Sequence, residues 1–280
     1  MKFTSVLYEA SHYFAFAIRR PKGHNDQARF VVSIDIDVGS EKLGIINGGT
    51  NDSNVHNDLS EREIGRIEGQ AIPVIVHILD DLEVPATFAI RGQLLEVDDS
   101  VIDLLRQSRV NHEIGAHGYY HKTFPSMPRS EADRELQLIS LQMRRHGINP
   151  KSFVFPKNDV AHLSLLQKWG YLCFRGSAGL LNDRMFIEKC GNLYDVHPSL
   201  YLAKCCDSFF LRKMIDLSIK RKTLLHVWFH LWDFGFSPES IDKRFVKTYL
   251  SMLKYVKQKE KESLLQTATM GSLAEAVSLI

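Results

Sequence analysis

Two carboxylates end an apolar run near the N-terminus of the chain. Asp35 and Asp37 lie in the segment SIDIDVG, where Ile34, Ile36 and Val38 are apolar. A spacing of two residues places both carboxylates on the same face of a β-strand. Two buried carboxylates repel each other unless they share a metal ion or a proton. We therefore interpret this pair as a candidate for metal binding or acid–base chemistry rather than as a solvated strand end.

Two histidines separated by three residues form a second candidate group. His117 and His121 lie in EIGAHGYYH, and two neutral imidazoles at this spacing can bind one metal ion. The spacing alone is weak evidence in a chain with 12 histidines, and a second such pair, His226 and His230, lies in LLHVWFHLW. His230 ends that apolar run. His226 lies four residues deeper in it, and we interpret it as a core histidine.

These groups together have the composition of a hydrolytic metal site. Asp37, His117 and His121 supply one carboxylate and two imidazoles and leave coordination positions open, as in catalytic sites for zinc or another divalent transition metal. Such a metal polarises a carbonyl and lowers the pKa of water. Hydrolysis also requires a general base, for which Asp35 is the nearby uncommitted carboxylate, and a general acid, for which His230 is the candidate.

The sequence pattern predicts an α/β fold as the scaffold that positions these residues. Short apolar runs, typical of buried parallel strands, alternate with helical patterns. The strand candidates are 30–36, 86–90, 113–116, 152–155, 171–175, 193–196 and 223–229, and the helical patterns fall at 60–82, 100–105, 130–147, 163–170, 207–221 and 239–260. Seven strands in series favour one barrel, in which functional residues lie at the carboxyl ends of strands.

Two local features qualify this pattern. Pro73 lies inside the first helical stretch and is expected to kink or restart it. Residues 39–59 are rich in Gly, Asn and Asp and lack periodicity, so we expect a loop directly after the first strand.

The composition is that of an ordinary globular protein. The 280 residues are 44% hydrophobic and carry a net charge of +2, which excludes a disordered chain and argues against a nucleic-acid-binding protein. Four cysteines without a CxxC pair do not form a disulfide framework. The first 20 residues make a poor signal peptide and no apolar run approaches a membrane span, so we expect a cytoplasmic protein. An oligomer is possible.

Five segments, taken in order over residues 30–235, resemble the motifs of the polysaccharide deacetylases, the NodB-homology family of carbohydrate esterases. They are VVSIDIDVG, ATFAIRG, HEIGAHGYYHKTF, FVFPKNDVAHLSLLQKWGYLCFR and LLHVWFHLW. The resemblance implies a distorted (β/α)7 barrel as a single domain over residues 29–280, with residues 1–28 as an N-terminal extension and further helices at the C-terminus.

The resemblance also implies an activity and roles for the candidate residues. It implies metal-dependent removal of an N- or O-acetyl group from an amino sugar or glycan, with Asp35 as base and His230 as acid. The metal ligands would be Asp37, His117 and His121. They would hold one divalent ion, with Zn²⁺ the first choice and Co, Ni, Fe or Mn as alternatives. The expected partner is an acetylated saccharide or sugar precursor.

The chain departs from the family pattern in its first and third motifs. Asp-Ile-Asp replaces adjacent aspartates, which is similar to the branch of intracellular peptidoglycan-deacetylase-like proteins and cyclic-imide hydrolases. The third motif lacks the arginine that orients the base in the family. Four residues are candidates to replace it: Lys157, Asn158, Arg91 and Arg175.

Other assignments stay open at this stage. The carboxylate that orients His230 is either Asp195 or Asp233. Residues with a possible role in substrate binding are Arg91, Tyr120, Lys157, Asn158 and Trp232, of which the two aromatic side chains suit stacking on sugars. Two alternative functions remain: hydrolysis of a cyclic imide or small amide on the same fold, and glycan binding without catalysis.

Overall fold

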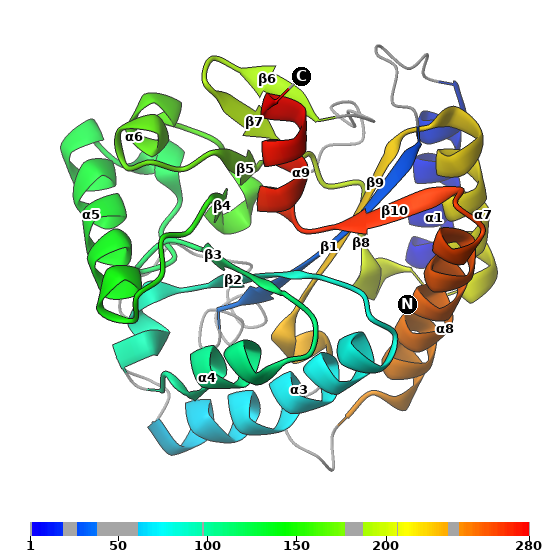
Figure 1. Cartoon of the computed structure of the whole chain (residues 1–280), viewed down its shortest axis with the longest axis horizontal. Helices are drawn as coiled ribbons and strands as arrows, with labels where there is room; N and C mark the ends of the chain where they lie inside the picture. The colour runs from blue at the N-terminus through cyan, green and yellow to red at the C-terminus, as the bar shows by residue number, and fades with distance from the viewer. Residues whose placement is uncertain are drawn as a thin grey trace.

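The computed structural model describes residues 2–18, 27–37, 61–96, 98–176, 187–205, 207–234 and 241–279. Its centre is a curled sheet of mostly parallel strands with helices outside it (Figure 1). Residues 39–59, predicted to form a loop, lie outside the described residues, as does Ser60 at the start of the first helical pattern.

All seven predicted strands are present and run parallel to one another. They are β1 (Ala28–Ile36), β2 (Thr87–Ile90), β3 (Glu113–Ala116), β4 (Ser152–Val154), β5 (Cys173–Arg175), β7 (Leu193–Asp195) and β9 (Leu224–His230), in the sheet order β7-β5-β4-β3-β2-β1-β9. Three short strands were not predicted: β6 (Glu188–Cys190), β8 (Leu200–Tyr201) and β10 (Leu265–Ala268). β6 flanks β7, β8 flanks β9, and no pairing joins β6 to β8 in the described part of the chain. The predicted single-domain barrel-type α/β fold is confirmed, as a barrel that curls without closing.

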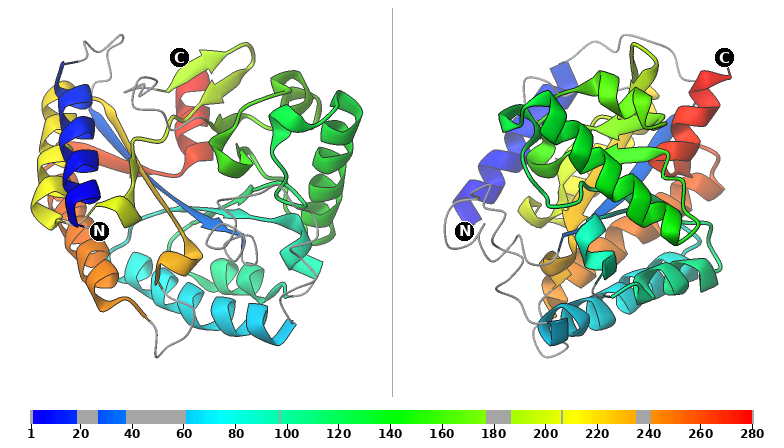
Figure 2. Two further views of the ribbon diagram at one scale, coloured as in Figure 1. Left: turned by 180° about the vertical axis from the view of Figure 1, so that it is seen from behind. Right: turned by 90° about the vertical axis from the view of Figure 1, so that its left-hand side faces the viewer.

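The helices lie in the intervals that the periodicity predicts. They are α3 (Glu61–Asp81), α4 (Ser100–Gln107), α5 (Arg129–Arg145), α6 (Leu163–Lys168), α7 (Ser208–Arg221) and α8 (Lys243–Lys261), with α1 (Lys2–Ile18) before the barrel and α9 (Met270–Ser278) at its end. Figure 2 shows them spread around the sheet. α3 runs as one helix through Pro73 rather than restarting there.

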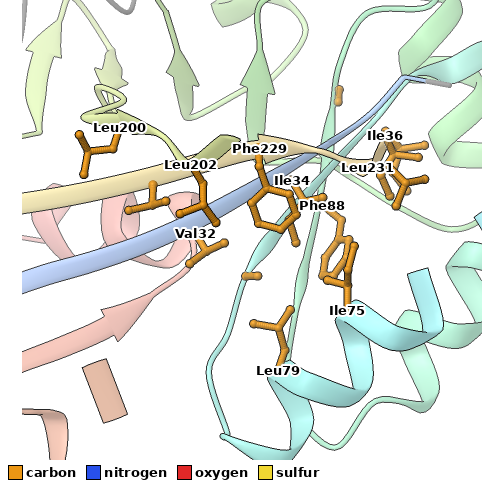
Figure 3. Packing of buried hydrophobic residues seen from close by; sticks show 14 of the residues in the cluster. Val32, Ile34, Ile36, Ile75, Leu79, Phe88, Leu200, Leu202, Phe229 and Leu231 are labelled. Carbon is orange, nitrogen blue, oxygen red and sulfur yellow. The ribbon is translucent and has the colours of Figure 1, made fainter. Parts of the chain in front are cut away.

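The alternation of side chains along β1 divides the core from the barrel interior. Val32, Ile34 and Ile36 face outward into the large apolar cluster, where Ile75 and Leu79 of α3 lie beside them (Figure 3). Successive side chains of a strand point to opposite faces, so the intervening polar residues of β1 face inward. This register directs the carboxylate of Asp35 into the interior of the barrel.

The C-terminal segment closes the bottom of the barrel. β10 pairs with residues Ala28–Val31 at the start of β1. The first turn of α9 packs against interior side chains at the same lower end of the barrel. The Met270 N–H donates to Thr87 Oγ1 (2.9 Å), and the Gly271 N–H donates to Glu113 Oε2 (2.8 Å). The sequence predicts only additional helices here, whereas the structure places β10 and α9, residues 265–278, against the lower end of the barrel.

Helix α1 occupies most of the predicted N-terminal extension and packs against α7. Phe16 of α1 is buried, and Arg221 at the end of α7 donates hydrogen bonds to the carbonyls of Phe16 and Ala17. A cationic side chain at the C-terminus of a helix satisfies carbonyls that lack partners within the helix. The extension is therefore attached to the barrel along α7.

Among the described helices, none combines the length and apolarity that crossing a membrane requires.

A buried histidine below the barrel makes stability depend on pH. The side chain of His112, just before β3, has no exposed area, and its Nδ1 accepts the Ala86 N–H (3.2 Å). Burial lowers the pKa of His112 from 6.5 to about 4. The unfolded chain therefore binds a proton that the folded chain does not between these pH values, so stability is present above pH 6.5 and is lost as pH falls toward 4.

We expect His112 to contribute a loss of about 2 kcal/mol in the free energy of unfolding between pH 7.5 and 4.5. Urea denaturation of the wild type and of His112→Asn at several pH values measures it, since asparagine keeps the acceptor for Ala86. The variant should lose less stability on acidification than the wild type. Equal losses in the two proteins would contradict the assignment.

Candidate active site

The parallel register brings the candidate residues to one edge of the sheet. Asp35 of β1 is the register partner of His230 of β9. The last residues of β1, β2 and β3 are aligned, so Asp37, Arg91 and His117 follow at the same edge. These residues are separated by many positions in the sequence, yet the carboxyl ends of adjacent strands place them side by side, as in barrel enzymes.

Asp37, His117 and His121 form the predicted three-residue cluster. Their potential ligand atoms lie within 4.8 Å of one another. His121 Nε2 is 3.1 Å from His117 Nε2 and 3.2 Å from Asp37 Oδ2, and His117 Nε2 is 3.8 Å from the same carboxylate oxygen. Asp37 and His117 are buried, and the side chain of His121 is 13% exposed.

The chemistry of this donor set fits a divalent metal ion. His117 Nδ1 donates to the Val154 carbonyl (2.9 Å), which leaves the Nε2 lone pair directed at the cluster. Burial lowers the pKa of His121 to about 3, so its ring is neutral. Burial alone would raise the pKa of Asp37, but the nearby rings of His117, His230 and His121 hold it well below its usual value. A carboxylate and two neutral imidazoles are the ligands that zinc and similar ions prefer.

The backbone between the two histidines depends on a glutamate that the sequence analysis missed. Gly118 and His121 have positive φ angles of 71° and 59°. Glu135 of α5 is buried, and its Oε1 accepts the N–H groups of Tyr119 (2.7 Å) and Tyr120 (2.6 Å). This carboxylate holds the turn that returns His121 toward His117. A lone glutamate in a helical pattern carries no local signal of such a contact.

Asp35 is held by Arg175, which was one of four candidates. The guanidinium of Arg175 donates from Nη1 to Asp35 Oδ1 (2.8 Å) and from Nη2 to Asp35 Oδ2 (2.5 Å), and both side chains are buried. Its Nε donates to Asn158 Oδ1 (3.0 Å). Burial alone would raise the pKa of Asp35, but the charge of Arg175 and its hydrogen bonds hold it below its usual value. Asp35 is therefore an anion in a fixed orientation.

His226 supports Arg175 from below. It is fully buried, as predicted for a core histidine, and burial lowers its pKa to about 3. Its Nδ1 donates to the Val196 carbonyl (3.0 Å), so Nε2 must accept from the hydroxyl of Ser33 (2.8 Å). The Ser33 oxygen in turn accepts from Arg175 Nη1 (2.8 Å). Donation therefore runs from Arg175 through Ser33 and His226 to the Val196 carbonyl, while Arg175 also donates to Asp35.

His230 lies on the other side of Asp35. Its Nε2 is 4.0 Å from Asp35 Oδ2, and its ring stacks on Trp232 with centroids 3.9 Å apart and planes at 14°. Asp233 Oδ2 accepts the backbone N–H of His230 (2.9 Å) and lies 3.7 Å from Nδ1. Burial alone would lower the pKa of His230, but Asp233 together with Asp37 and Asp35 raises it above the usual value.

Asp233, rather than Asp195, is thus the carboxylate beside His230. Asp195 Oδ2 lies 3.4 Å from Nδ1 of a different histidine, His197. Asp195 ends β7, and the next element along the sheet on that side is β6 rather than β9. The order of the strands decides between two carboxylates that the sequence leaves equivalent.

The predicted substrate-binding residues fall into two groups. Trp232 contacts His230, Asn158 holds Arg175, and the charge of Arg91, buried at the end of β2, acts on His121. By contrast, Tyr120 is half-buried with its ring against Tyr119, and Lys157 is exposed at a positive φ of 56°. No described contact joins these two residues to Asp35 or His230. The structure therefore brings three of the five candidates to the site.

Comparisons with known proteins concern the fold and the sequence of one part of the chain. The family model described as polysaccharide deacetylase matches residues 65–173. No functionally curated protein matches the chain in sequence. A candidate polysaccharide deacetylase from Mycobacterium smegmatis has 16% identity and a TM-score of 0.68, over 93% of this chain and 94% of its own. Another from Pseudomonas aeruginosa PAO1 has 11% identity and a TM-score of 0.64, over 88% and 89%.

A third solved structure is a carbohydrate esterase family 4 pseudoenzyme from Bacillus anthracis. It has 13% identity and a TM-score of 0.51, over 91% of this chain and 68% of its own. At these identities the structural likeness concerns the fold. The chain thus has the fold of the polysaccharide deacetylases over most of its length. It resembles that family in sequence over residues 65–173, so the resemblance seen in its motifs is confirmed.

Proposed function

We propose that this protein is a metal-dependent hydrolase that removes an acetyl group from an amino sugar or glycan. The observation that carries the proposal is the position of Asp35, which lies 3.9 Å from His117 Nε2 on one side and 4.0 Å from His230 Nε2 on the other. A candidate base thus lies between a candidate metal cluster and a candidate acid. The polysaccharide deacetylase family match supports the same chemistry.

Each of the chain's own residues has a distinct part in this proposal. A divalent ion held by Asp37, His117 and His121 would polarise the acetyl carbonyl and lower the pKa of water. Asp35, kept anionic by Arg175, accepts the proton of the attacking water. His230, whose pKa is raised, donates a proton through Nε2 to the leaving nitrogen or oxygen.

Two alternative functions are tested together with the proposed one. The Asp-Ile-Asp motif favours a cyclic imide or small amide as substrate. Similarity in fold to a pseudoenzyme raises glycan binding without catalysis as the other alternative. The presence of all five residues of the proposed machinery supports hydrolysis over binding alone: Asp35, Asp37, His117, His121 and His230.

The experiment is a measurement of acetate release after loading the protein with Zn²⁺, Co²⁺, Ni²⁺, Fe²⁺ or Mn²⁺. The panel contains N-acetylglucosamine oligomers, O-acetylated sugars, and hydantoin- and imide-type compounds with ring opening as readout. Release of acetate that is lost in Asp35→Asn supports the proposal. Ring opening without acetate release favours the imide hydrolase, and saccharide binding without any turnover favours the binding protein.

A further inference from the structure

The hydrogen bonds around His230 assign a role to Tyr201, the last residue of β8. Its hydroxyl lies 3.1 Å from His230 Nδ1 and 3.1 Å from Asp233 Oδ1. The direct separation between His230 Nδ1 and Asp233 Oδ2 is 3.7 Å, too long for a hydrogen bond. Tyr201 is therefore inserted between the histidine ring and the carboxylate.

The direction of each hydrogen bond follows from what each group can donate. An ionised carboxylate only accepts, so Tyr201 donates its single hydroxyl proton to Asp233. The tyrosine oxygen can then only accept at His230 Nδ1, which must carry a proton. Burial together with Asp233 raises the pKa of Tyr201, which keeps the phenol protonated. His230 therefore presents Nε2, the nitrogen near Asp35, as its exchangeable site.

Packing keeps Tyr201 in this position. Its ring stacks on Trp228 of β9 with centroids 4.4 Å apart and planes at 22°. Its backbone N–H donates to the hydroxyl of Tyr8 in α1 (2.8 Å). Helix α1 is in turn attached to α7 through Arg221. Two successive hydrogen bonds, from Tyr8 to Tyr201 and from Tyr201 to His230, thus connect the N-terminal extension with the candidate acid.

We propose that Tyr201 is a positioning residue that fixes the proton-bearing nitrogen and the orientation of His230, and that α1 holds Tyr201 through Tyr8. This inference rests on the proposed function for its catalytic consequence. A general acid acts on the leaving group, so a misplaced acid slows substrates with basic leaving groups and spares those whose leaving group departs unaided. That pattern separates positioning of the acid from general damage to the fold.

The test compares the zinc-loaded wild type with Tyr201→Phe on esters of one acyl group. We expect kcat for ethyl acetate to fall by up to about 100-fold and that for phenyl acetate by less, with KM unchanged, because the need for a general acid grows with the basicity of the leaving group. For p-nitrophenyl acetate kcat should change less than about threefold, since its leaving group needs little protonation. Tyr8→Phe should show the same pattern with a smaller loss.

Tyr249→Phe is the matched control. Tyr249 is fully buried in the main apolar cluster, and its hydroxyl has no hydrogen-bond partner among the described residues. It lies away from His230, against Phe229 and Phe234, and its loss should leave the whole ester series unchanged. An equal loss on all three esters in Tyr201→Phe, with or without an effect of the control, would overturn the proposal.

A spectroscopic readout keeps the inference independent of the activity. The ¹⁵N spectrum of His230, assigned by comparison with His230→Gln and recorded at a pH where its ring is neutral, should show a protonated Nδ1 in the zinc-loaded wild type and a mixture of tautomers in Tyr201→Phe. An unchanged tautomer in the variant would overturn the role of Tyr201. If the wild type hydrolyses no substrate while the tautomer changes as expected, the proposed function fails and the positioning of His230 stands.

Discussion

His117→Ala is expected to abolish binding of a divalent metal and, with it, hydrolysis. The substitution removes one of three potential ligands. In the wild type, the hydrogen bond from His117 Nδ1 to the Val154 carbonyl directs His117 Nε2 at the cluster. We expect the affinity for Zn²⁺ to fall more than about 100-fold, because even changes that only remove a hydrogen bond to a ligand cost about 10–100-fold. Mass-spectrometric metal analysis after reconstitution and dialysis measures bound zinc per chain.

His112→Asn provides the control for that experiment. His112 lies five positions upstream and is equally buried, but it faces Asp80 and Phe88 rather than the cluster. Its replacement should leave zinc content at about one ion per chain. Equal zinc content in His117→Ala and the wild type, or none in either, would contradict the proposed metal site.

Arg175→Met is expected to have the largest effect on stability. The substitution leaves the Asp35 carboxylate buried without its cation, in a site where both side chains are inaccessible to solvent. Breaking a buried ion pair by removing one partner costs about 3–5 kcal/mol. Urea denaturation at pH 7.5 should show that loss in the free energy of unfolding, and hydrolysis should be lost as well.

A second substitution tests whether the uncompensated charge of Asp35 causes the loss of stability. Arg175→Met combined with Asp35→Asn removes the uncompensated charge, and replacement of both partners of a buried ion pair is often neutral. The double variant should recover more than half of the lost stability while remaining inactive. A double variant as unstable as Arg175→Met would show that packing of the arginine, including its contact with Trp228 at 4.6 Å, dominates over charge.

The elements of the fold were predictable because their signals are local. The seven barrel strands are short apolar runs, and each contains its own evidence in the residue types of three to nine positions. The candidate base, acid and metal ligands were identifiable for the same reason, since each lies at the end of such a run. The strands β6, β8 and β10 escaped prediction because none forms an apolar run: β6 is EKC, β10 is LQTA, and β8 has only two residues.

The partners of those residues were not predictable in the same way. Arg175, Glu135, Ser33 and Tyr201 are ordinary side chains in their local segments, and none stands at a spacing that identifies a function. Their importance lies in contacts across the barrel, such as that between Arg175 and Asp35, 140 positions apart. A local pattern cannot encode which of several arginines reaches a given carboxylate.

The sequence by itself determined a parallel α/β barrel with two carboxylates and three histidines at its strand ends. Only the tertiary structure decided that Arg175 holds Asp35. It also decided that Asp233 rather than Asp195 lies beside His230, and that the Tyr201 hydroxyl connects Asp233 with His230. The physical reason is that strand alternation and helical periodicity depend on neighbouring residues, whereas hydrogen-bond partners depend on the order, register and curl of the whole sheet.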